Sequence, residues 1–550
     1  MEFKKNQIVE LYIDDIGNEG EGIGHIDGYA LFLKDAVIGD KVRAKIIKTK
    51  KNYGFARVEE VIEASKDRVS QRCSKARQCG GCTLQHLAYE KQLEYKFNKV
   101  KNCLERIGGL ENIEEKMEPI LGMEEPFYYR NKAQFPVGYD KEGNLITGFY
   151  AGRTHHIIDC THCMIQHPVN EQILLKVLDY MKKNNITAYD EKTHKGLVRH
   201  IVTRVGFKTG EIMVCLVVNG SKKNLRNLEM LVDSLTEVEG MTSICVNINK
   251  EKTNRILGSK IEEVYGKPYI YDYIGNVKYQ IGPLSFFQVN PTQTKVLYEK
   301  AMEYADLKGE ETVWDLYCGI GTISLFLAQK AKKVYGVEIV KEAIDDARLN
   351  AKMNGFDNAE FFVGKAEEVL PREYEKNGVY ADTIVVDPPR KGCDSKLLET
   401  MVKMAPKRIV YVSCDPATLA RDLKVLSEQG YEVEKVCAVD QFSHSSHVET
   451  VVLLSKGMVD SRKVKVDFSL EDMDLSEFKG KATYEQIKEY VLEETGLKVS
   501  SLYIAQIKKK CGLDVGENFN PAKSENARQP QCTPEKEDAI MQAFSHFGII

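Results

Sequence analysis

The chain has no apolar run long enough to span a membrane, and no signal-like apolar stretch follows its initial Met-Glu-Phe-Lys-Lys. It has no internal repeat and no low-complexity tract, and its net charge is only −4 at pH 7. These absences argue against a membrane protein, a secreted protein and a uniformly basic chain. A length of 550 residues predicts several domains. We therefore expect a cytoplasmic, multidomain protein.

Cysteine is plentiful, with fourteen residues, but a cytoplasmic chain is not expected to use them as disulfides. Four stand in apolar surroundings and are expected to be core residues: Cys103, Cys215, Cys245 and Cys437. The others include two clusters, one formed by Cys73, Cys79 and Cys82 and one by Cys160 and Cys163. Clustered thiols predict metal ligation.

Residues 1–64 predict a small, OB-like β-barrel, since alternating segments such as 8–13 and 41–47 are separated by glycine-rich turns. Seven basic residues and no acidic one lie between Lys41 and Arg57, with Tyr53 and Phe55 among them. A basic, aromatic face is typical of barrels that bind single-stranded nucleic acid. We expect RNA contact here, and the alternative is an ordinary solvated face.

The rest of the chain predicts three further regions in an overall α/β architecture. Residues 65–290 mix strands and helices, including a basic helix over 89–106, and form a central α+β domain. Residues 291–457 alternate strands and helices, which indicates a doubly wound, Rossmann-like sheet. Residues 458–550 predict a helical extension. It contains a charged linker, a capping box at Thr483 and Gln486, and a second helix that starts at Ser500 or Ser501. This arrangement fits a helix-turn-helix or a plain helical hairpin.

Three expected strands end in polar or small residues, and the carboxyl ends of such strands meet at the ligand-binding edge of an open sheet. The strand at 312–314 runs into Asp315-Leu-Tyr-Cys-Gly-Ile-Gly321, the one at 383–386 into Asp387-Pro-Pro-Arg390, and the one at 408–412 into Ser413-Cys-Asp-Pro416. This pattern places a thiol, Cys414, at the rim of a nucleotide-type pocket. The alternative for Cys414 is a buried, inert thiol.

The first of these loops predicts a cofactor site. Its glycines precede a helix, and Glu338, about 20 residues later at the end of the next strand, is placed to bind ribose hydroxyls. A dinucleotide site is possible, but the third glycine of G-x-G-x-x-G is absent. Since Asp387-Pro-Pro-Arg390 suits methyltransferases better, we favour S-adenosylmethionine.

A thiol at this rim suits methylation of uracil at C5, a carbon that is barely nucleophilic. Addition of a thiolate to C6 makes C5 a nucleophile for the methyl group, and a base must then remove the C5 proton. Cys414 is the candidate nucleophile, and Glu449, before the apolar segment 450–454, is the candidate base. Considered singly, Asp387 also fits a helix cap and Glu449 a solvated strand end.

At this point the chain resembles the RNA 5-methyluridine methyltransferases of the bacterial tRNA and 23S rRNA type. The segments that carry the resemblance follow the family's order and are 285–292, 315–321, 386–390, 411–422 and 446–450. The resemblance covers residues 1 to about 457 and leaves the tail without a role. Thr322 departs from it, because several relatives carry Asn there.

The resemblance implies roles for single residues. Cys414 would be the nucleophile and Glu449 the base. The residues that would line the S-adenosylmethionine site are Gln288, Tyr317, Glu338 and Asp387, with Asp387 also near the uracil. The N-terminal region would be a TRAM domain that binds RNA.

The cysteine clusters allow two interpretations. Two C-x2-C pairs, Cys79 with Cys82 and Cys160 with Cys163, would suit zinc. The resemblance instead implies a [4Fe–4S] cluster on Cys73, Cys79, Cys82 and Cys163, with Cys160 as a spare thiol, and this is the assignment that we favour. The C-x3-C-x2-C spacing of radical enzymes is absent, so we expect a structural or RNA-positioning role.

These inferences predict a monomeric, S-adenosylmethionine-dependent RNA (uracil-5-)-methyltransferase. We expect 23S rRNA as the substrate, since the barrel with its cysteine cluster resembles the 23S enzymes more closely. The alternatives are a tRNA uracil-5-methyltransferase, a methyltransferase acting on an exocyclic nitrogen, and a non-catalytic RNA-binding or assembly protein.

Overall fold

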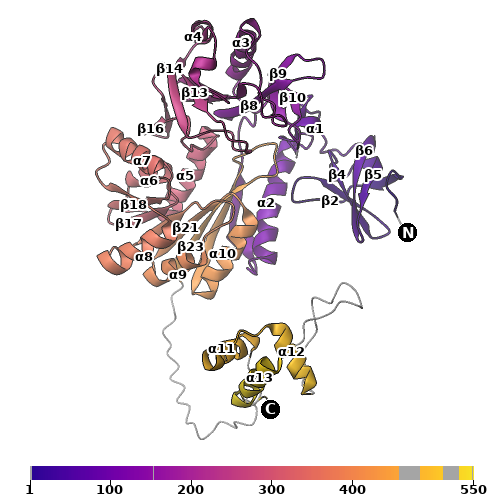
Figure 1. Ribbon diagram of the computed structural model, residues 1–550, viewed down its shortest axis with the longest axis vertical. Coiled ribbons are helices and arrows are strands. Elements are labelled where there is room, and N and C mark those ends of the chain that lie inside the picture. The colour runs from indigo at the N-terminus through magenta and orange to yellow at the C-terminus, as the bar shows by residue number, and fades with distance from the viewer. Residues whose placement is uncertain (1–2, 153, 457–482, 512–531, 548, 550) are drawn as a thin grey trace. The chain divides into compact units, whose positions relative to one another are not determined.

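The computed structural model describes residues 3–152, 154–456, 483–511, 532–547 and 549 (Figure 1). The chain forms two units, Met1–Val459 and Asp460–Ile550, which are described in turn. Among the described helices, none has the length and apolar character needed to cross a membrane.

The N-terminal region is a six-stranded sheet in the order β1-β5-β6-β4-β3-β2. Its strands are β1 (Ile8–Tyr12), β2 (Asp15–Ile16), β3 (Gly22–Ile26), β4 (Tyr29–Lys34), β5 (Lys41–Thr49) and β6 (Tyr53–Glu63). Alternate residues, such as Val42, Ala44 and Ile46 on β5, fill a small apolar core. The predicted strands at 8–13 and 41–47 are thus confirmed, whereas closure of the sheet into a barrel stays a prediction.

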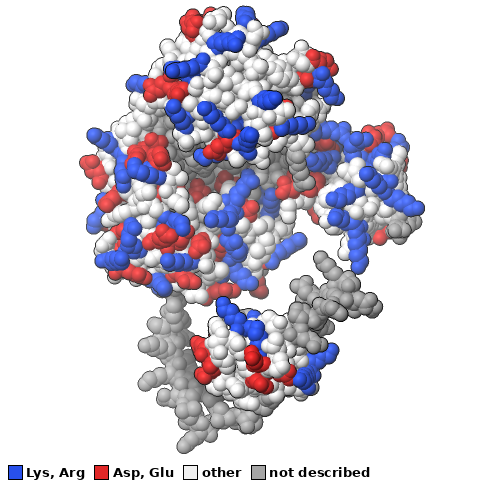
Figure 2. All heavy atoms as spheres, viewed as in Figure 1, with Lys and Arg blue, Asp and Glu red and all other residues white. Residues whose placement is uncertain are grey.

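The basic segment of this sheet is partly neutralised by carboxylates from neighbouring strands. The Arg43 guanidinium lies 2.9 Å from Glu10 on β1 and 2.5 Å from Glu60 on β6, and Lys41 lies 3.3 Å from Glu63. Lys48, beyond these pairs, is exposed. Figure 2 shows basic side chains gathered over this region together with acidic ones. The face carries mixed charge, which a count within residues 41–57 does not detect.

The segment that follows contains two α-helices, a 3-10 helix and a strand: α1 (Ala76–Cys79), α2 (Tyr89–Arg106), η1 (Ile113–Lys116) and β7 (Met117–Leu121). The basic helix predicted over 89–106 is therefore confirmed at both ends. Its residues Val100 and Leu104 are fully buried and pack in the core of the third region, described below. Figure 1 shows α2 lying beside α10, far from it in sequence.

The central region is a seven-stranded sheet in the order β10-β9-β8-β11-β12-β13-β14. Its strands are β8 (Lys132–Tyr139), β9 (Leu145–Tyr150), β10 (Ile157–Asp159), β11 (Val198–Val205), β12 (Ile212–Val218), β13 (Met241–Ile248) and β14 (Lys260–Gly266). Helices α3 (Val169–Lys183) and α4 (Leu228–Thr236) pack against it in one apolar core, and η2 (Lys222–Asn224) connects to α4. The hairpin β15 (Ile270–Ile274) and β16 (Val277–Ile281) leads to the next region.

The third region is built on an eight-stranded sheet in the order β19-β18-β17-β20-β21-β23-β22-β7. The strands after β7 are β17 (Thr312–Leu316), β18 (Lys333–Glu338), β19 (Ala359–Val363), β20 (Thr383–Val386), β21 (Arg408–Ser413), β22 (Tyr431–Val439) and β23 (Glu449–Lys456). The helices are α5 (Pro291–Ala305), α6 (Thr322–Ala328), α7 (Lys341–Asn354), α8 (Ala366–Asn377), α9 (Ser395–Met404) and α10 (Pro416–Glu428).

Strands β17 to β21 are parallel, and the chain order reverses between β17 and β20, which is where an open α/β sheet binds its ligand. Two apolar cores cover the two faces, one containing Val313 and Val385 and the other Trp314 and Ile384. The predicted doubly wound parallel sheet is confirmed.

Strand β7 belongs to the sheet of the third region, although it lies before the predicted domain boundary at residue 290. It precedes the central sheet in sequence but pairs in parallel with β22, with Met117 opposite Val436. The central region is thus an insertion between β7 and β17, two strands of the same sheet.

The second unit contains three helices among its described residues: α11 (Tyr484–Thr495), α12 (Ser501–Lys510) and α13 (Pro534–His546). The capping box at Thr483 and Gln486 is present, and Ser500 caps α12. The third helix, which was not predicted, shares an apolar core with the first two through Ile540 and Phe544. The predicted linker at 460–481 lies outside the described residues.

Candidate active site

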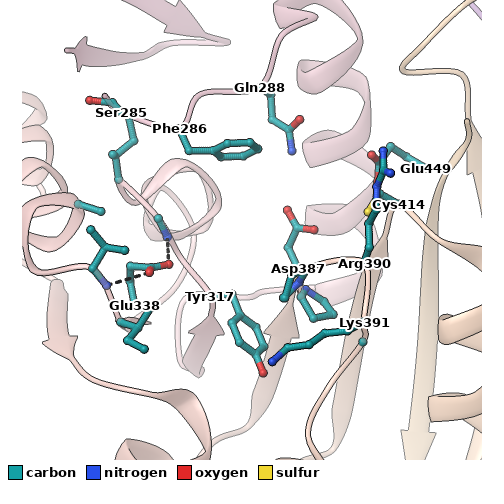
Figure 3. Close-up of a pocket in the computed structure, with 18 of the residues that line it drawn as sticks. Ser285, Phe286, Gln288, Tyr317, Glu338, Asp387, Arg390, Lys391, Cys414 and Glu449 are labelled. Carbon is teal, nitrogen blue, oxygen red and sulfur yellow. Dashed lines mark hydrogen bonds between the residues drawn. The ribbon is translucent and has the colours of Figure 1, made fainter. Parts of the chain in front are cut away.

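A cavity of about 2370 Å³ opens at the carboxyl ends of β17, β18, β20 and β21 (Figure 3). The six residues proposed from sequence for catalysis and cofactor binding all line it: Gln288, Tyr317, Glu338, Asp387, Cys414 and Glu449. Pockets for one small molecule are usually about 300–1000 Å³. The cavity therefore has room for a cofactor together with a large second ligand.

One side of the cavity is formed by the turn after β17. Tyr317 has φ 70°, and Gly319 and Gly321 follow with φ 56° and 81°. A Cβ on Gly319 would meet no atom within 4 Å, so this position favours glycine for its backbone conformation rather than for lack of space. A non-glycine residue in the left-handed region costs about 1–3 kcal/mol and is typical of functional sites.

Glu338, the last residue of β18, is fixed beside that turn. Its carboxylate accepts hydrogen bonds from the backbone N–H groups of Gly319 (3.3 Å) and Val340 (3.0 Å), drawn in Figure 3. Ile339, next to it, is 58% exposed and lines the cavity. An immobilised carboxylate beside an apolar surface suits a ribose with an adjoining base. The sequence pattern predicted Glu338 as a ribose-binding residue but gave no role to Ile339.

The register of three strands brings the reactive candidates together. Val386 on β20 pairs with Tyr411 on β21, and Ser413 on β21 pairs with Thr450 on β23. Asp387, Cys414 and Glu449 are the residues that adjoin these pairs at the cavity. Glu449 is the first residue of β23 rather than the residue before it, as the sequence reading had placed it.

The end of β21 is held by the helix that follows. Asp415 caps α10, and its carboxylate accepts hydrogen bonds from the N–H groups of Ala417 and Thr418, each at 3.0 Å. Pro416 occupies the first turn, where its missing N–H costs nothing. Cys414 is therefore confined between a strand and a capped helix.

Burial controls the ionisation of these groups. It raises the pKa of Glu449 to about 8, with a further contribution from Asp387, while Arg390 opposes the shift. It also raises the pKa of Asp387 to about 7. For Cys414, burial and then the two carboxyl groups raise the pKa to about 11, and Arg390 again opposes them. A pKa of about 11 favours the protonated thiol over the thiolate at neutral pH.

Several lining residues carried no role in the sequence reading. Arg390 is the cation that faces the thiol and Glu449, and Phe286, beside Gln288, is 69% exposed at the cavity. An exposed aromatic ring in a cavity is available for stacking on a base. The side chain of Thr322, by contrast, shares a hydrogen bond of 2.9 Å with the hydroxyl of Tyr298, which is a core residue.

The cysteine clusters come together in space and adjoin this cavity. The thiols of Cys73, Cys79 and Cys163 all contribute to raising the pKa of Cys82, after burial, so the four lie within electrostatic range of one another. Gly80 and Gly81, between them, line the cavity. Within the described ranges, however, no three His, Cys, Asp or Glu side chains form a group that could hold a metal ion.

Comparison with known proteins identifies the family. A family model described as tRNA (Uracil-5-)-methyltransferase matches residues 88–457, and a TRAM domain model matches residues 2–58. An uncharacterized RNA methyltransferase of Clostridium tetani is 53% identical over 453 residues, which cover 82% of this chain and 97% of that protein. One of Halalkalibacterium halodurans is 52% identical, with coverage of 82% and 97%.

A solved structure supports the same conclusion. The Pyrococcus abyssi tRNA (uracil-54, C5)-methyltransferase, in complex with S-adenosyl-L-homocysteine, is 29% identical with a TM-score of 0.66. The match covers 81% of this chain and 100% of that one. The resemblance inferred from sequence is thereby confirmed, as are the enzyme class and S-adenosylmethionine as its cofactor. The chain belongs to the tRNA (uracil-5-)-methyltransferase family of RNA methyltransferases and carries a TRAM domain at its N-terminus.

Proposed function

We propose that this enzyme methylates C5 of a uracil in RNA through a transient bond between the Cys414 sulfur and C6, with Glu449 as the base. One observation carries the proposal: a thiol directly after β21 and a buried carboxyl group at the start of β23, its antiparallel neighbour, face the same cavity as the Glu338 turn. Transfer to an exocyclic nitrogen would need no thiol at that place.

The reaction runs in two stages. The Cys414 thiolate adds to C6, and the electron pair of the C5–C6 double bond attacks the methyl carbon of the sulfonium. The bond between that carbon and sulfur breaks, and S-adenosylhomocysteine is the leaving group. Glu449 then takes the C5 proton, the electrons of that C–H bond restore the double bond, and the C6–S bond breaks to return the thiolate. Because its pKa of about 8 lies near neutrality, Glu449 is suited to exchange a proton there.

The remaining lining residues divide between cofactor and base. Glu338 would bind the ribose hydroxyls, and Tyr317 and Gln288 would contact the rest of the cofactor. Asp387 would lie between the cofactor and the uracil. Arg390, which counteracts the two carboxyl groups, would favour the thiolate form of Cys414.

We propose 23S rRNA as the substrate, with tRNA as the second candidate. The resemblance of the N-terminal sheet and cysteine segment to the 23S enzymes favours rRNA. The Pyrococcus abyssi relative, which is named for uracil 54 of tRNA, favours tRNA. Nucleoside mapping of both RNA fractions from cells lacking the protein decides between them.

We also propose that Cys73, Cys79, Cys82 and Cys163 hold a [4Fe–4S] cluster. Two observations support this: the thiols influence one another's pKa, and backbone N–H groups that hydrogen-bond to Cys79 and Cys163 oppose the rise in pKa that burial causes there. The Cys160 thiol instead donates to the His162 carbonyl at 3.2 Å, which supports its role as a spare thiol. A bound cluster would supply structural support to the Gly80-Gly81 edge of the cavity.

An oligonucleotide containing 5-fluorouracil tests the mechanism. Fluorine at C5 cannot leave as a proton does, so the wild-type enzyme with S-adenosylmethionine is expected to remain covalently attached to the RNA. The Cys414→Ala variant is expected to bind RNA normally and to form neither the adduct nor 5-methyluridine. Turnover by Cys414→Ala, or an N-methylated nucleoside in the product, would refute the proposal.

A further inference from the structure

The segment that delivers Glu449 is a loop of an unusual kind. We call residues 440–448, between β22 and β23, the base loop. Connecting loops normally run over the surface, where water satisfies their polar groups. Here five polar side chains are only 0–4% exposed: Asp440, Gln441, Ser443, His444 and Ser446. Such a loop needs protein partners for its polar groups.

One face of helix α2 supplies several of these partners, while Asn290 and Thr294 hold Gln441. Tyr89, Gln92, Lys96 and Lys99 are spaced by three, four and three residues, so they lie along one side of the helix. The Tyr89 hydroxyl donates to Asp440 at 2.7 Å. The Lys99 ammonium donates to the Ser446 carbonyl at 2.9 Å.

Gln92 holds the middle of the base loop. Its side-chain oxygen accepts from the His444 N–H at 3.0 Å, and its amide nitrogen lies 3.2 Å from the His444 ring. His444 has φ 63°, a strained conformation for a residue with a side chain. The Leu84 N–H donates to its carbonyl at 2.9 Å. Partners on both sides of His444 thus hold the strained turn.

A buried ion pair anchors the first residue of the loop. The ammonium of Lys96 bonds to the Asp440 carboxylate, and both side chains are 0% exposed. Lys96 also donates to the Phe442 carbonyl at 2.9 Å, and the Ser443 hydroxyl donates to Asp440 at 2.9 Å. A buried ammonium without partners is strongly destabilising, so the Asp440 carboxylate and the Phe442 carbonyl tie the loop to Lys96 on α2.

The same helix face reaches the TRAM domain. Lys99, which holds Ser446, also donates to the Asn18 carbonyl at 2.9 Å, and the Tyr95 hydroxyl donates to the carbonyls of Gly17 and Asn18. Glu19, in the same turn, lines the active-site cavity. Helix α2 therefore joins the N-terminal sheet to the base loop.

We propose that Lys96 and Asp440, supported by Lys99, are positioning residues for Glu449. They hold the base loop so that the Glu449 carboxylate stays aimed at the C5 proton of the methylated adduct. The inference rests on the proposed function, in which Glu449 is the base. None of the three is placed to touch the reacting atoms. Their loss is therefore expected to act through Glu449 and to slow the step that Glu449 performs.

This assignment makes a prediction about which step slows. Thiolate addition and methyl transfer come first and do not use Glu449, whereas resolution of the adduct requires it to remove the C5 proton. A loosened base loop therefore leaves methylated RNA attached to Cys414. A displacement of about 1 Å from the reactive geometry is enough to slow a step by roughly 100-fold.

The test uses the full-length enzyme with unmodified RNA and S-adenosylmethionine. The double variant K96M/D440L removes both charges and leaves neither buried alone. Lys99→Met is a milder change, because its partners are uncharged carbonyls. Lys91→Met, on the same helix but paired with Glu94 at the surface, is the matched control. Thermal melts verify folding, and denaturing gels measure the covalent enzyme–RNA complex through single turnovers.

We expect kcat of the double variant to fall roughly 10- to 100-fold, with the KM for RNA within about twofold of wild type and the covalent complex accumulating. Lys99→Met is expected to show a smaller change in the same direction, and Lys91→Met none. Wild-type kcat in the folded variants, or adduct formation slowed as much as resolution, would overturn the assignment. If the double variant does not fold, Lys99→Met decides alone. Failure of the wild-type enzyme to form an adduct with the 5-fluorouracil RNA refutes the proposed function instead.

Discussion

Cys414 and Glu449 lie beside each other because Ser413 on β21 pairs with Thr450 on β23. The two residues are separated by 34 others in sequence, but they are the residues that directly follow and precede this pair at the end of the antiparallel register. Groups carried on strands are held more precisely than groups on free loops. The geometry of the candidate thiol and base therefore follows from backbone pairing.

The first prediction concerns the ionisation of Cys414. Burial and then two carboxyl groups raise the pKa of this thiol to about 11, so a nearby cation should lower it. We expect sinefungin, which carries an ammonium where the cofactor has its sulfonium, to speed alkylation of Cys414 at pH 8. S-adenosylhomocysteine, which is neutral at that atom, should not. The measurement is the rate of iodoacetamide labelling by mass spectrometry, and equal rates with the two ligands would contradict the argument.

The second prediction concerns stability. Folding raises the pKa of Glu449 from its ordinary value to about 8, so the folded protein binds a proton more tightly than the unfolded chain. Its contribution to stability is therefore present in acid and is lost as the pH rises towards 8. Glu449→Gln cannot ionise, and we expect it to be more stable than wild type by about 1–3 kcal/mol at pH 9 and not at pH 4.5. Thermal melts across this range measure the difference, and a gain independent of pH would refute it.

The third prediction concerns the cofactor. If Glu338 binds the ribose hydroxyls, Glu338→Gln loses charged hydrogen bonds of about 1.5–3 kcal/mol. We expect the Kd for S-adenosylhomocysteine to rise by roughly 10- to 100-fold in calorimetry. The control is Glu360→Gln on the neighbouring strand, whose carboxylate pairs with Lys333 at the surface. Similar losses in both variants would mean that a general change of charge is responsible.

The fourth prediction separates the cysteines. After anaerobic purification, we expect iron and acid-labile sulfide in the wild-type protein and in Cys160→Ser, and their loss in Cys163→Ser. The two variants make the same chemical change three residues apart. Stoichiometric zinc without iron, or loss of iron in Cys160→Ser alone, would reject the proposed cluster ligands.

The fifth prediction concerns the tail. Among the residues that the structure describes, those that line the cavity all belong to the first unit. A chain ending at residue 459 is therefore expected to bind S-adenosylhomocysteine with a Kd within about threefold of the full-length protein. Calorimetry on both proteins checks this, and a larger loss would mean that the second unit contributes to the site.

Local patterns in the sequence predicted a large part of this structure. The strand at 383–386 and the helix at 89–106 have the bounds that their residues suggested, because the patterns that indicated them are local. The partners of Arg43 and the buried polar face of α2 were not predicted, since each depends on residues distant in sequence. Gln92 and Lys96 are polar residues of a helix predicted only as basic, and the folded structure shows that both are buried.

The pairing of β7 with β22 has a consequence for how this protein is made. Residues 117–121 leave the ribosome more than 300 residues before the strand that they accompany. During synthesis these residues have no strand partner until β22 has been made, and the whole central sheet is synthesised in between. A gene fragment that starts at residue 291 would lack this strand and expose β22, so we expect such a fragment to aggregate.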